Sequence, residues 1–181
     1  GLCCTTLKAE VVITEFFIKQ ADSTHTPQYI ELYNNSNSLI DLTYWSITTL
    51  DSLDGDVISE SLFDNNGDDN MEIGPFGYFL ISSSWCNYST SGCADGKFYN
   101  GESDIIFPGL ILPFKDPSWQ GLFEDKGSII LKDNNNVVVD RIDYDIATWP
   151  VGENSRGHSL RLHIASGSDD NNNPDNWSLS P

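Results

Sequence analysis

A short acidic stretch, DNNGDDNME at residues 64–72, places oxygen-bearing side chains at alternate positions. Calcium takes carboxylate and amide oxygens as ligands, so this spacing suits a calcium site. It is not an EF-hand loop, because Gly67 is at the fourth place and no bidentate Glu occupies the twelfth. The alternative is that Asp and Asn only make turns here, as in the similar segments 51–56 and 168–176. The candidate ligands are Asp64, Asn66, Asp68, Asn70 and Glu72.

Glu31 is the second residue that suggests chemistry, because it stands among apolar and aromatic neighbours in QYIELYN, residues 28–34. Strand alternation places Glu31 on one face with two tyrosines, and Ile30 and Leu32 on the other. The apolar pair then enters the core, and the acid stays on the outer face. A glycosidase would need a second carboxylate at a defined separation, and the sequence singles none out. We therefore expect Glu31 to be structural.

Other catalytic patterns are incomplete. The sequence GHSLR at 157–161 begins like a nucleophile elbow, but Arg161 stands where the second Gly belongs, and the segment is a predicted strand. The sequence contains no HExxH motif and no Gly-rich phosphate loop. His158 and His163 would point to opposite faces of a strand, which argues against a joint metal site. The motifs therefore predict that the chain is not an enzyme.

The cysteines indicate an oxidising compartment. Cys86 and Cys93 lie in WCNYSTSGCADG, where Ser, Thr and Gly allow the chain to close a small loop. We expect a disulfide between them rather than a metal site, because no second Cys or His pair stands nearby at zinc spacing. For the adjacent Cys3 and Cys4, free thiols or a lipid-anchor cysteine are the alternatives. An extracellular, cell-surface or periplasmic location is therefore expected.

The charge balance restricts the partners. The formal net charge is -18, with only 9 Lys and Arg and no basic cluster. Nucleic-acid binding depends on such residues to neutralise phosphates, so a nucleic-acid ligand is excluded. The same charge repels anionic membrane surfaces, and no apolar run reaches the ~18 residues that span a bilayer. The acidity suits a soluble secreted protein, a salt-adapted one or one that binds cations, and no cofactor other than calcium is implied.

Short apolar runs, rich in β-branched and aromatic residues, recur between Asn, Asp, Gly and Pro. Helical periodicity is almost absent, so the runs predict an antiparallel β-sandwich or barrel. Residues 133–136, DNNN, predict a tight hairpin turn, because Asn tolerates the left-handed conformation. The polar tail, if ordered, would be pinned by Trp177 and Leu179. The predicted strands are 10–18, 28–34, 39–50, 56–63, 71–83, 127–133, 136–145 and 158–164.

The region 83–126 differs from the rest, because its aromatic residues are scattered without period among Gly, Pro and Ser. A long loop of this composition folds back as a minidomain or covers another part of the protein. We treat it as an insertion into a single domain, 10–181, that follows a flexible segment, 1–9. Its rings either supply anchors for a partner or form a local core. The candidate binding residues are Trp85, Tyr88, Tyr99 and Trp119.

Five motifs follow one another along the chain. VVITEFF contains an I-x-E element, and the next segment carries E-L-x-N and D-L-x-x-W through Glu31, Leu32, Asn34, Asp41, Leu42 and Trp45. IGPFGYFLI contributes Pro75, Gly77 and Tyr78. The hairpin segment contributes Leu131, Asp133, Val139, Asp140, Ile142 and Tyr144. The closing segments contribute Trp149, Pro150, Gly157, Ser159, Leu160 and Trp177.

In these motifs the chain resembles the lamin tail domain, in the form found in bacterial secreted and surface proteins, over nearly all of residues 10–177. The resemblance implies an immunoglobulin-like β-sandwich and a module not known as an enzyme. The chain departs from the family pattern at Gln28, at Arg161 and Leu162, and in the length of 83–126. Nuclear partners are not implied, because the acidic chain lacks the basic surface that nucleic-acid contact needs.

We therefore predict a non-catalytic extracellular interaction module that binds a protein or a carbohydrate at the cell surface, with the insertion as the contact region. A calcium-stabilised structural or adhesive domain is one alternative. The other is a secreted hydrolase whose carboxylates lie in the insertion, namely Asp95, Glu102, Asp104 and Asp116.

Overall fold

The computed structural model describes residues 10–17, 29–52, 55–63, 71–83, 105–107, 122, 126–150, 158–163 and 170–180. Within these residues the regular structure is β-strand apart from one short 3-10 helix, Pro174–Asn176. The predicted all-β class is therefore confirmed. None of the described residues belongs to a helix long and apolar enough to cross a membrane.

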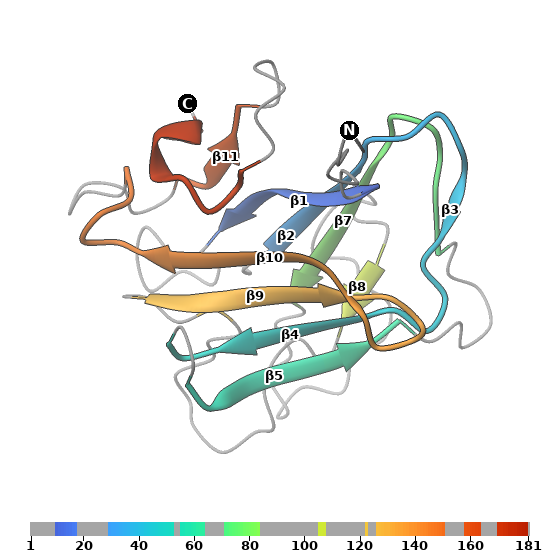
Figure 1. Ribbon diagram of the computed structural model, residues 1–181, viewed down its shortest axis with the longest axis horizontal. Coiled ribbons are helices and arrows are strands. Elements are labelled where there is room, and N and C mark those ends of the chain that lie inside the picture. The colour runs from blue at the N-terminus through green and yellow to red at the C-terminus, as the bar shows by residue number, and fades with distance from the viewer. Residues whose placement is uncertain are drawn as a thin grey trace, which may run out of the picture.

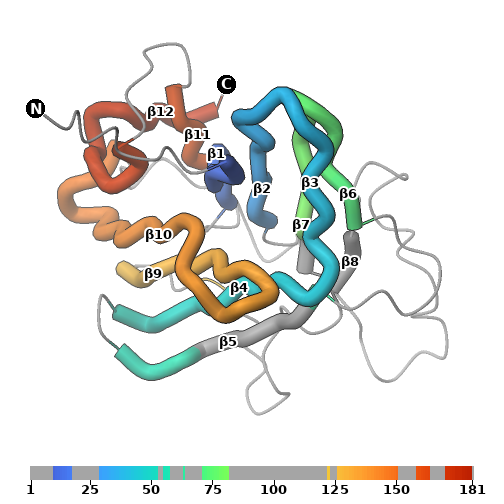
Figure 2. The backbone as a smooth tube through the Cα atoms, turned by 45° about the vertical axis from the view of Figure 1, so that its right-hand side comes forward, coloured from blue at the N-terminus to red at the C-terminus, as the bar shows by residue number. Residues whose placement is uncertain are grey.

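Two sheets face each other (Figures 1 and 2). The larger sheet has the strand order β12 (Trp177–Leu179), β11 (Leu160–Leu162), β1 (Val11–Phe17), β2 (Tyr29–Asn34), β7 (Tyr78–Ser83) and β8 (Ile105–Phe107). The smaller sheet has the order β10 (Val138–Asp145), β9 (Lys126–Lys132), β4 (Ser46–Leu50) and β5 (Val57–Leu62). The chain thus forms a β-sandwich.

Strand alternation supplies the core between the sheets. In β2, Ile30 and Leu32 are fully buried, whereas Glu31 is half-buried on the opposite face. This confirms the faces predicted for the strand. One cluster of buried residues draws side chains from both sheets, among them Phe16, Phe79, Ile81, Ile47, Ile129, Leu131 and Tyr144.

One strand pairing differs from the predicted antiparallel arrangement. β8 runs parallel to β7, with Ile81 opposite Ile105, while the other pairings are antiparallel. Parallel neighbours need a crossover connection of a dozen or more residues. Residues 84–104 separate these two strands, so the chain is long enough to return in the same direction.

A third sheet of two short strands, β3 (Ile40–Asp41) and β6 (Glu72–Ile73), lies at one end of the sandwich, on the right in Figure 1. The predicted strand 39–50 is therefore divided into β3 and β4. The Asp41 Oδ1 accepts the Thr43 N–H at 2.8 Å, which forms a turn between them. A second turn, with the Gly77 N–H bonded to the Gly74 carbonyl at 2.9 Å, divides 71–83 into β6 and β7.

The β9–β10 hairpin forms as predicted. The Asp133 N–H donates to the Val137 carbonyl at 2.9 Å, and Asn136 has a φ of 61°, in the left-handed region. The Asp133 carboxylate accepts the N–H groups of Asn135 and Val137 at 2.8 and 2.9 Å. These hydrogen bonds, led by that of Val137, hold the pKa of Asp133 below its usual value.

The polar tail is pinned as expected from its two apolar residues. Trp177 is buried, and its ring centroid lies 5.1 Å from that of Phe16 in the core. Its Nε1–H donates to the Asn171 carbonyl at 2.9 Å. Leu179 packs partly buried against the same core. The tail thereby adds β12 to the larger sheet.

Candidate interaction surfaces

Asp140 joins three segments of the chain. It lies in β10, beside β1 at the edge where the two sheets meet (Figure 1). Its Oδ2 accepts the Ile13 N–H at 2.7 Å and the Asn171 side-chain amide at 2.7 Å, and its Oδ1 accepts the Arg141 N–H at 2.9 Å. Burial raises the pKa of Asp140, while these hydrogen bonds oppose the shift. These hydrogen bonds connect β10 to β1 and to the segment that contains Asn171, so the Asp140 carboxylate has a structural role.

Asn34, at the end of β2, has a similar role in the larger sheet. Its side chain is fully buried. Its Nδ2 donates to the carbonyls of Ser38, Ile73 and Gly74 at 2.6, 3.1 and 3.0 Å. Its Oδ1 accepts the Ser36 N–H at 2.9 Å. Asn34 thereby fixes the two loops beside β3 and β6.

Glu31 lies on the outer face of the larger sheet, directly across from Glu15 of β1 and Leu80 of β7. The Thr14 Oγ1–H donates to its Oε1 at 2.8 Å. Burial raises the pKa of Glu31; the Thr14 hydrogen bond lowers it, and the charge of Glu15 raises it further. Glu15 itself accepts the hydroxyls of Tyr29, at 2.6 Å, and Ser159.

Sequence reasoning did not identify Glu15 as the neighbour of Glu31. The pairing depends on a β-bulge between Ile13 and Glu15, which shifts the register of β1 against β2. The I-x-E motif contains Glu15, but nothing in the local sequence specifies which residue of another strand it opposes.

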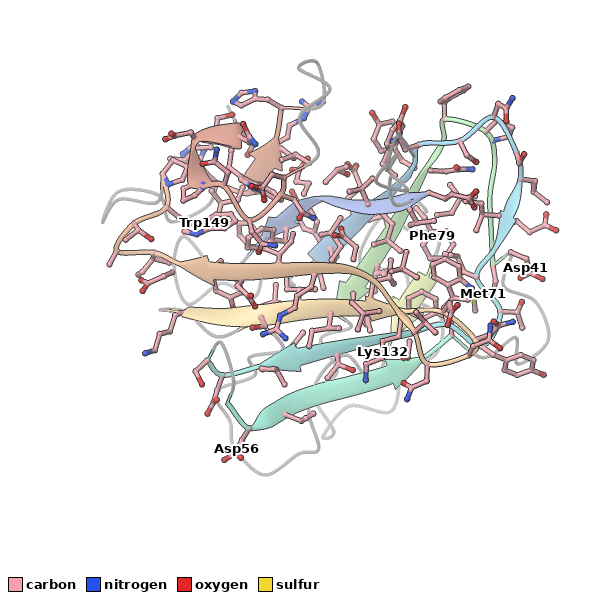
Figure 3. All side chains as sticks on the ribbon, in the orientation of Figure 1. Asp41, Asp56, Met71, Phe79, Lys132 and Trp149 are labelled. Atoms are coloured by element: carbon pink, nitrogen blue, oxygen red, sulfur yellow. The ribbon has the colours of Figure 1, made fainter. Side chains whose placement is uncertain are left out.

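Apolar side chains are exposed at the end of the sandwich that carries β3 and β6. Figure 3 labels Asp41 at this end and Asp56 at the opposite end. The residues lie in the connections between β2 and β4, between β6 and β7, and in the β9–β10 hairpin. We define the end surface as Leu39, Tyr44, Phe76, Val137 and Val138.

Two aromatic residues of the end surface have an unusual backbone. Tyr44 and Phe76 have φ angles of 66° and 54°, and their side chains are 60% and 57% exposed. The left-handed region is uncommon for a bulky residue and costs of order 1–3 kcal/mol each. Hydrogen bonds hold both turns: the Tyr44 N–H donates to the Phe63 carbonyl at 2.7 Å, and the Phe76 N–H to the Ser36 carbonyl at 3.2 Å. Turn residues such as Pro75 mark these loops in the sequence, but they do not predict the φ angles.

The calcium prediction is largely outside the described residues, which include Glu72 but not 64–70. Glu72 is exposed in β6, with Asp41 as its cross-strand neighbour. In the two segments of similar composition, the described side chains make turn and loop hydrogen bonds. The Asp51 Oδ1 accepts the Asp56 N–H at 3.0 Å, and the Asn172 amide donates to the Arg141 carbonyl at 3.0 Å. The described residues contain no group of three or more His, Cys, Asp or Glu arranged to hold a metal ion.

The predicted contact residues of the insertion also lie outside the described residues, as do the predicted disulfide and the carboxylates of the hydrolase alternative. These are Trp85, Tyr88, Tyr99, Trp119, Cys86, Cys93, Asp95, Glu102, Asp104 and Asp116. No protein-family model matches the chain, and no curated protein matches it. The relation to the lamin tail domain therefore stays a prediction from the motifs.

Proposed function

We propose that the chain is a non-catalytic extracellular interaction module of the lamin tail type, with an immunoglobulin-like sandwich that binds a protein or glycan partner. The observation that carries this proposal is the exposure of Tyr44 and Phe76 on left-handed backbone. Backbone strain of this kind persists where the surrounding structure holds it, and it clusters at functional sites. Fixed aromatic side chains also bind partners at a low entropic cost.

The hydrogen bonds of the polar motif residues support a non-catalytic role. Asp140 and Asn34 are occupied by hydrogen bonds that connect strands and loops, and Glu15 accepts two hydroxyl groups. A general acid or base must instead reach the proton that it transfers. The net charge of -18 and the spacing of Cys86 and Cys93 support an extracellular location.

The test removes the two rings without disturbing the turns. Asn tolerates positive φ, so Tyr44→Asn with Phe76→Asn keeps the backbone and deletes the aromatic contacts. The matched control is Val57→Asn, because Val57 is 60% exposed at the opposite end, beside Asp56. Each protein is immobilised and exposed to extracellular and cell-surface extracts, and captured material is quantified by mass spectrometry for proteins and glycans.

We expect one or more partners to be captured by the wild-type protein and by Val57→Asn, and to be lost from the double variant. The melting temperature of the double variant should not fall, since Asn relieves backbone strain. Equal capture by all three proteins would show that the end surface is not the contact region.

A further inference from the structure

The outer face of the larger sheet carries a second group of side chains. In β2 and β7, Tyr33 and Tyr78 are cross-strand partners, with ring centroids 4.9 Å apart. Glu31 is the next outward residue along β2, about 7 Å from Tyr33 by strand geometry. Arg161 of β11 opposes Glu15, two strands away from Glu31. We call Tyr33, Tyr78, Glu31 and Arg161 the sheet patch.

The sheet patch is open to solvent. Tyr78 is 50% exposed, Arg161 is exposed, and Tyr33 and Glu31 are half-buried. These residues are on regular strands, with their backbone in the sheet ladder, so their spacing is fixed. Phe79, labelled in Figure 3, alternates with Tyr78 and is buried in the core. β7 therefore presents Tyr78 to solvent on its outer face and Phe79 to the core on its inner face.

Several polar groups of the sheet patch have no hydrogen-bond partner in the described part of the chain. They are the hydroxyls of Tyr33 and Tyr78, the guanidinium of Arg161 and the Glu31 Oε2. Burial raises the pKa of the Tyr78 hydroxyl, and the charge of Glu31 raises it further, so the phenol stays a neutral donor near these acids. The sheet patch thus offers hydrogen-bond donors and a carboxylate acceptor beside two aromatic rings.

We infer that the sheet patch binds a neutral glycan. A sugar ring presents an apolar C–H face, which stacks on aromatic rings, and hydroxyls, which bond to carboxylate and guanidinium groups. This inference rests on the proposed interaction module and assigns it one ligand class. The patch has one guanidinium against Glu31 and Glu15, in a chain with a net charge of -18, so anionic glycans are repelled.

The test is a glycan array that carries neutral, sialylated, uronic and sulfated glycans, probed with the full chain. The best neutral ligand is then titrated by calorimetry against wild type, Tyr78→Ala and Arg161→Ala. We expect affinity to fall roughly tenfold or more in each variant, from lost stacking or lost charged hydrogen bonds. The matched control is Val57→Asn, an exposed position on β5 of the smaller sheet, which should bind the glycan with unchanged affinity.

A second measurement needs no substitution. Nitration of the exposed tyrosines of the wild-type protein, followed by peptide mass spectrometry, should slow at Tyr33 and Tyr78 when the neutral glycan is present. Tyr44, on the end surface, should react at the same rate with and without it.

The outcomes separate this inference from the proposed function. Unchanged affinity in Tyr78→Ala and Arg161→Ala, or unprotected Tyr33 and Tyr78, would overturn the sheet patch as the binding site. Binding of acidic glycans alone, or of no glycan, would overturn the ligand class. A captured protein that is lost in Tyr78→Ala would also overturn it, because the face would then bind protein. In each case the capture experiment with Tyr44→Asn and Phe76→Asn remains a separate test of the proposed interaction module.

Discussion

Asp140→Ala should destabilise the fold by about 2–4 kcal/mol. The change leaves the Ile13 N–H and the Asn171 amide without their acceptor, and both residues are buried away from water. Each buried donor left unpaired costs about 1–3 kcal/mol. The loss is partly offset, because burial raises the pKa of Asp140 and an ionised buried carboxylate is itself costly.

The matched control is Asp143→Ala, two residues along β10. The Asp143 carboxylate accepts from Arg141 Nε at 2.8 Å, and both side chains are about one third exposed. An ion pair with this exposure contributes about 0–1 kcal/mol. The buried Ser128 hydroxyl also donates to the Asp143 Oδ1, at 2.6 Å, but it keeps the Ser52 carbonyl at 3.4 Å as a second acceptor. Asp143→Ala should therefore cost less than Asp140→Ala. Urea denaturation followed by circular dichroism gives the free energy of unfolding of each variant.

Hydrogen exchange tests the same reasoning at one atom. In Asp140→Ala the amide of Ile13 should exchange faster than in wild type, while in Asp143→Ala it should not change. If the two variants lose the same stability, or if the Ile13 amide stays protected, Asp140 does not join the sheets in the way described.

Three further predictions concern packing, pH and calcium. Gly127→Ala should cost about 1–3 kcal/mol in urea denaturation, because a Cβ would lie 2.6 Å from both the Leu50 carbonyl oxygen and the Tyr144 hydroxyl; full stability would show that β9 and β4 can separate there. Burial raises the pKa of Glu31 above its usual value of 4.5, so the folded protein favours the protonated carboxyl. The stability that this preference contributes is fully present below pH 4.5 and is lost as the pH rises through the folded-state pKa. Glu31→Gln should therefore match wild type near pH 4 and exceed its melting temperature at pH 7; equal values at both pH values would contradict the shift. If calcium binds at 64–72, EDTA should lower the melting temperature and added calcium should restore it, whereas no change would remove the calcium prediction.

Local patterns predicted the elements whose structure depends on nearby residues. The alternation in β2 fixed which side chains enter the core, and the Asn residues after Asp133 fixed the hairpin. The division of 39–50 was missed because the Asp41 side chain, rather than a Gly or Pro, makes the turn. In these cases the information lies within a few residues.

Long-range contacts could not be predicted from local patterns. Asp140 accepts hydrogen bonds from Ile13 and from Asn171, which are 127 and 31 residues away along the chain. The pairing of Glu15 with Glu31 depends on a bulge, and the parallel pairing of β8 depends on the course of a long connection. The exposed positions of Tyr44 and Phe76 follow from φ angles that single residues do not determine.

The short outer strands affect how the protein behaves at high concentration. Among the described strands, the larger sheet ends in β12 and β8, each of three residues, which offer few unpaired backbone groups to another molecule. The smaller sheet has two outer strands, β10 of eight residues and β5 of six. Asn172 bonds the Asp143 N–H and the Arg141 carbonyl of β10, so β5 is the more open template for intermolecular pairing. Mutual repulsion at a net charge of -18 keeps copies apart near neutral pH. Aggregation should therefore begin as the solution approaches the isoelectric point of about 4.1, and it should spread from β5.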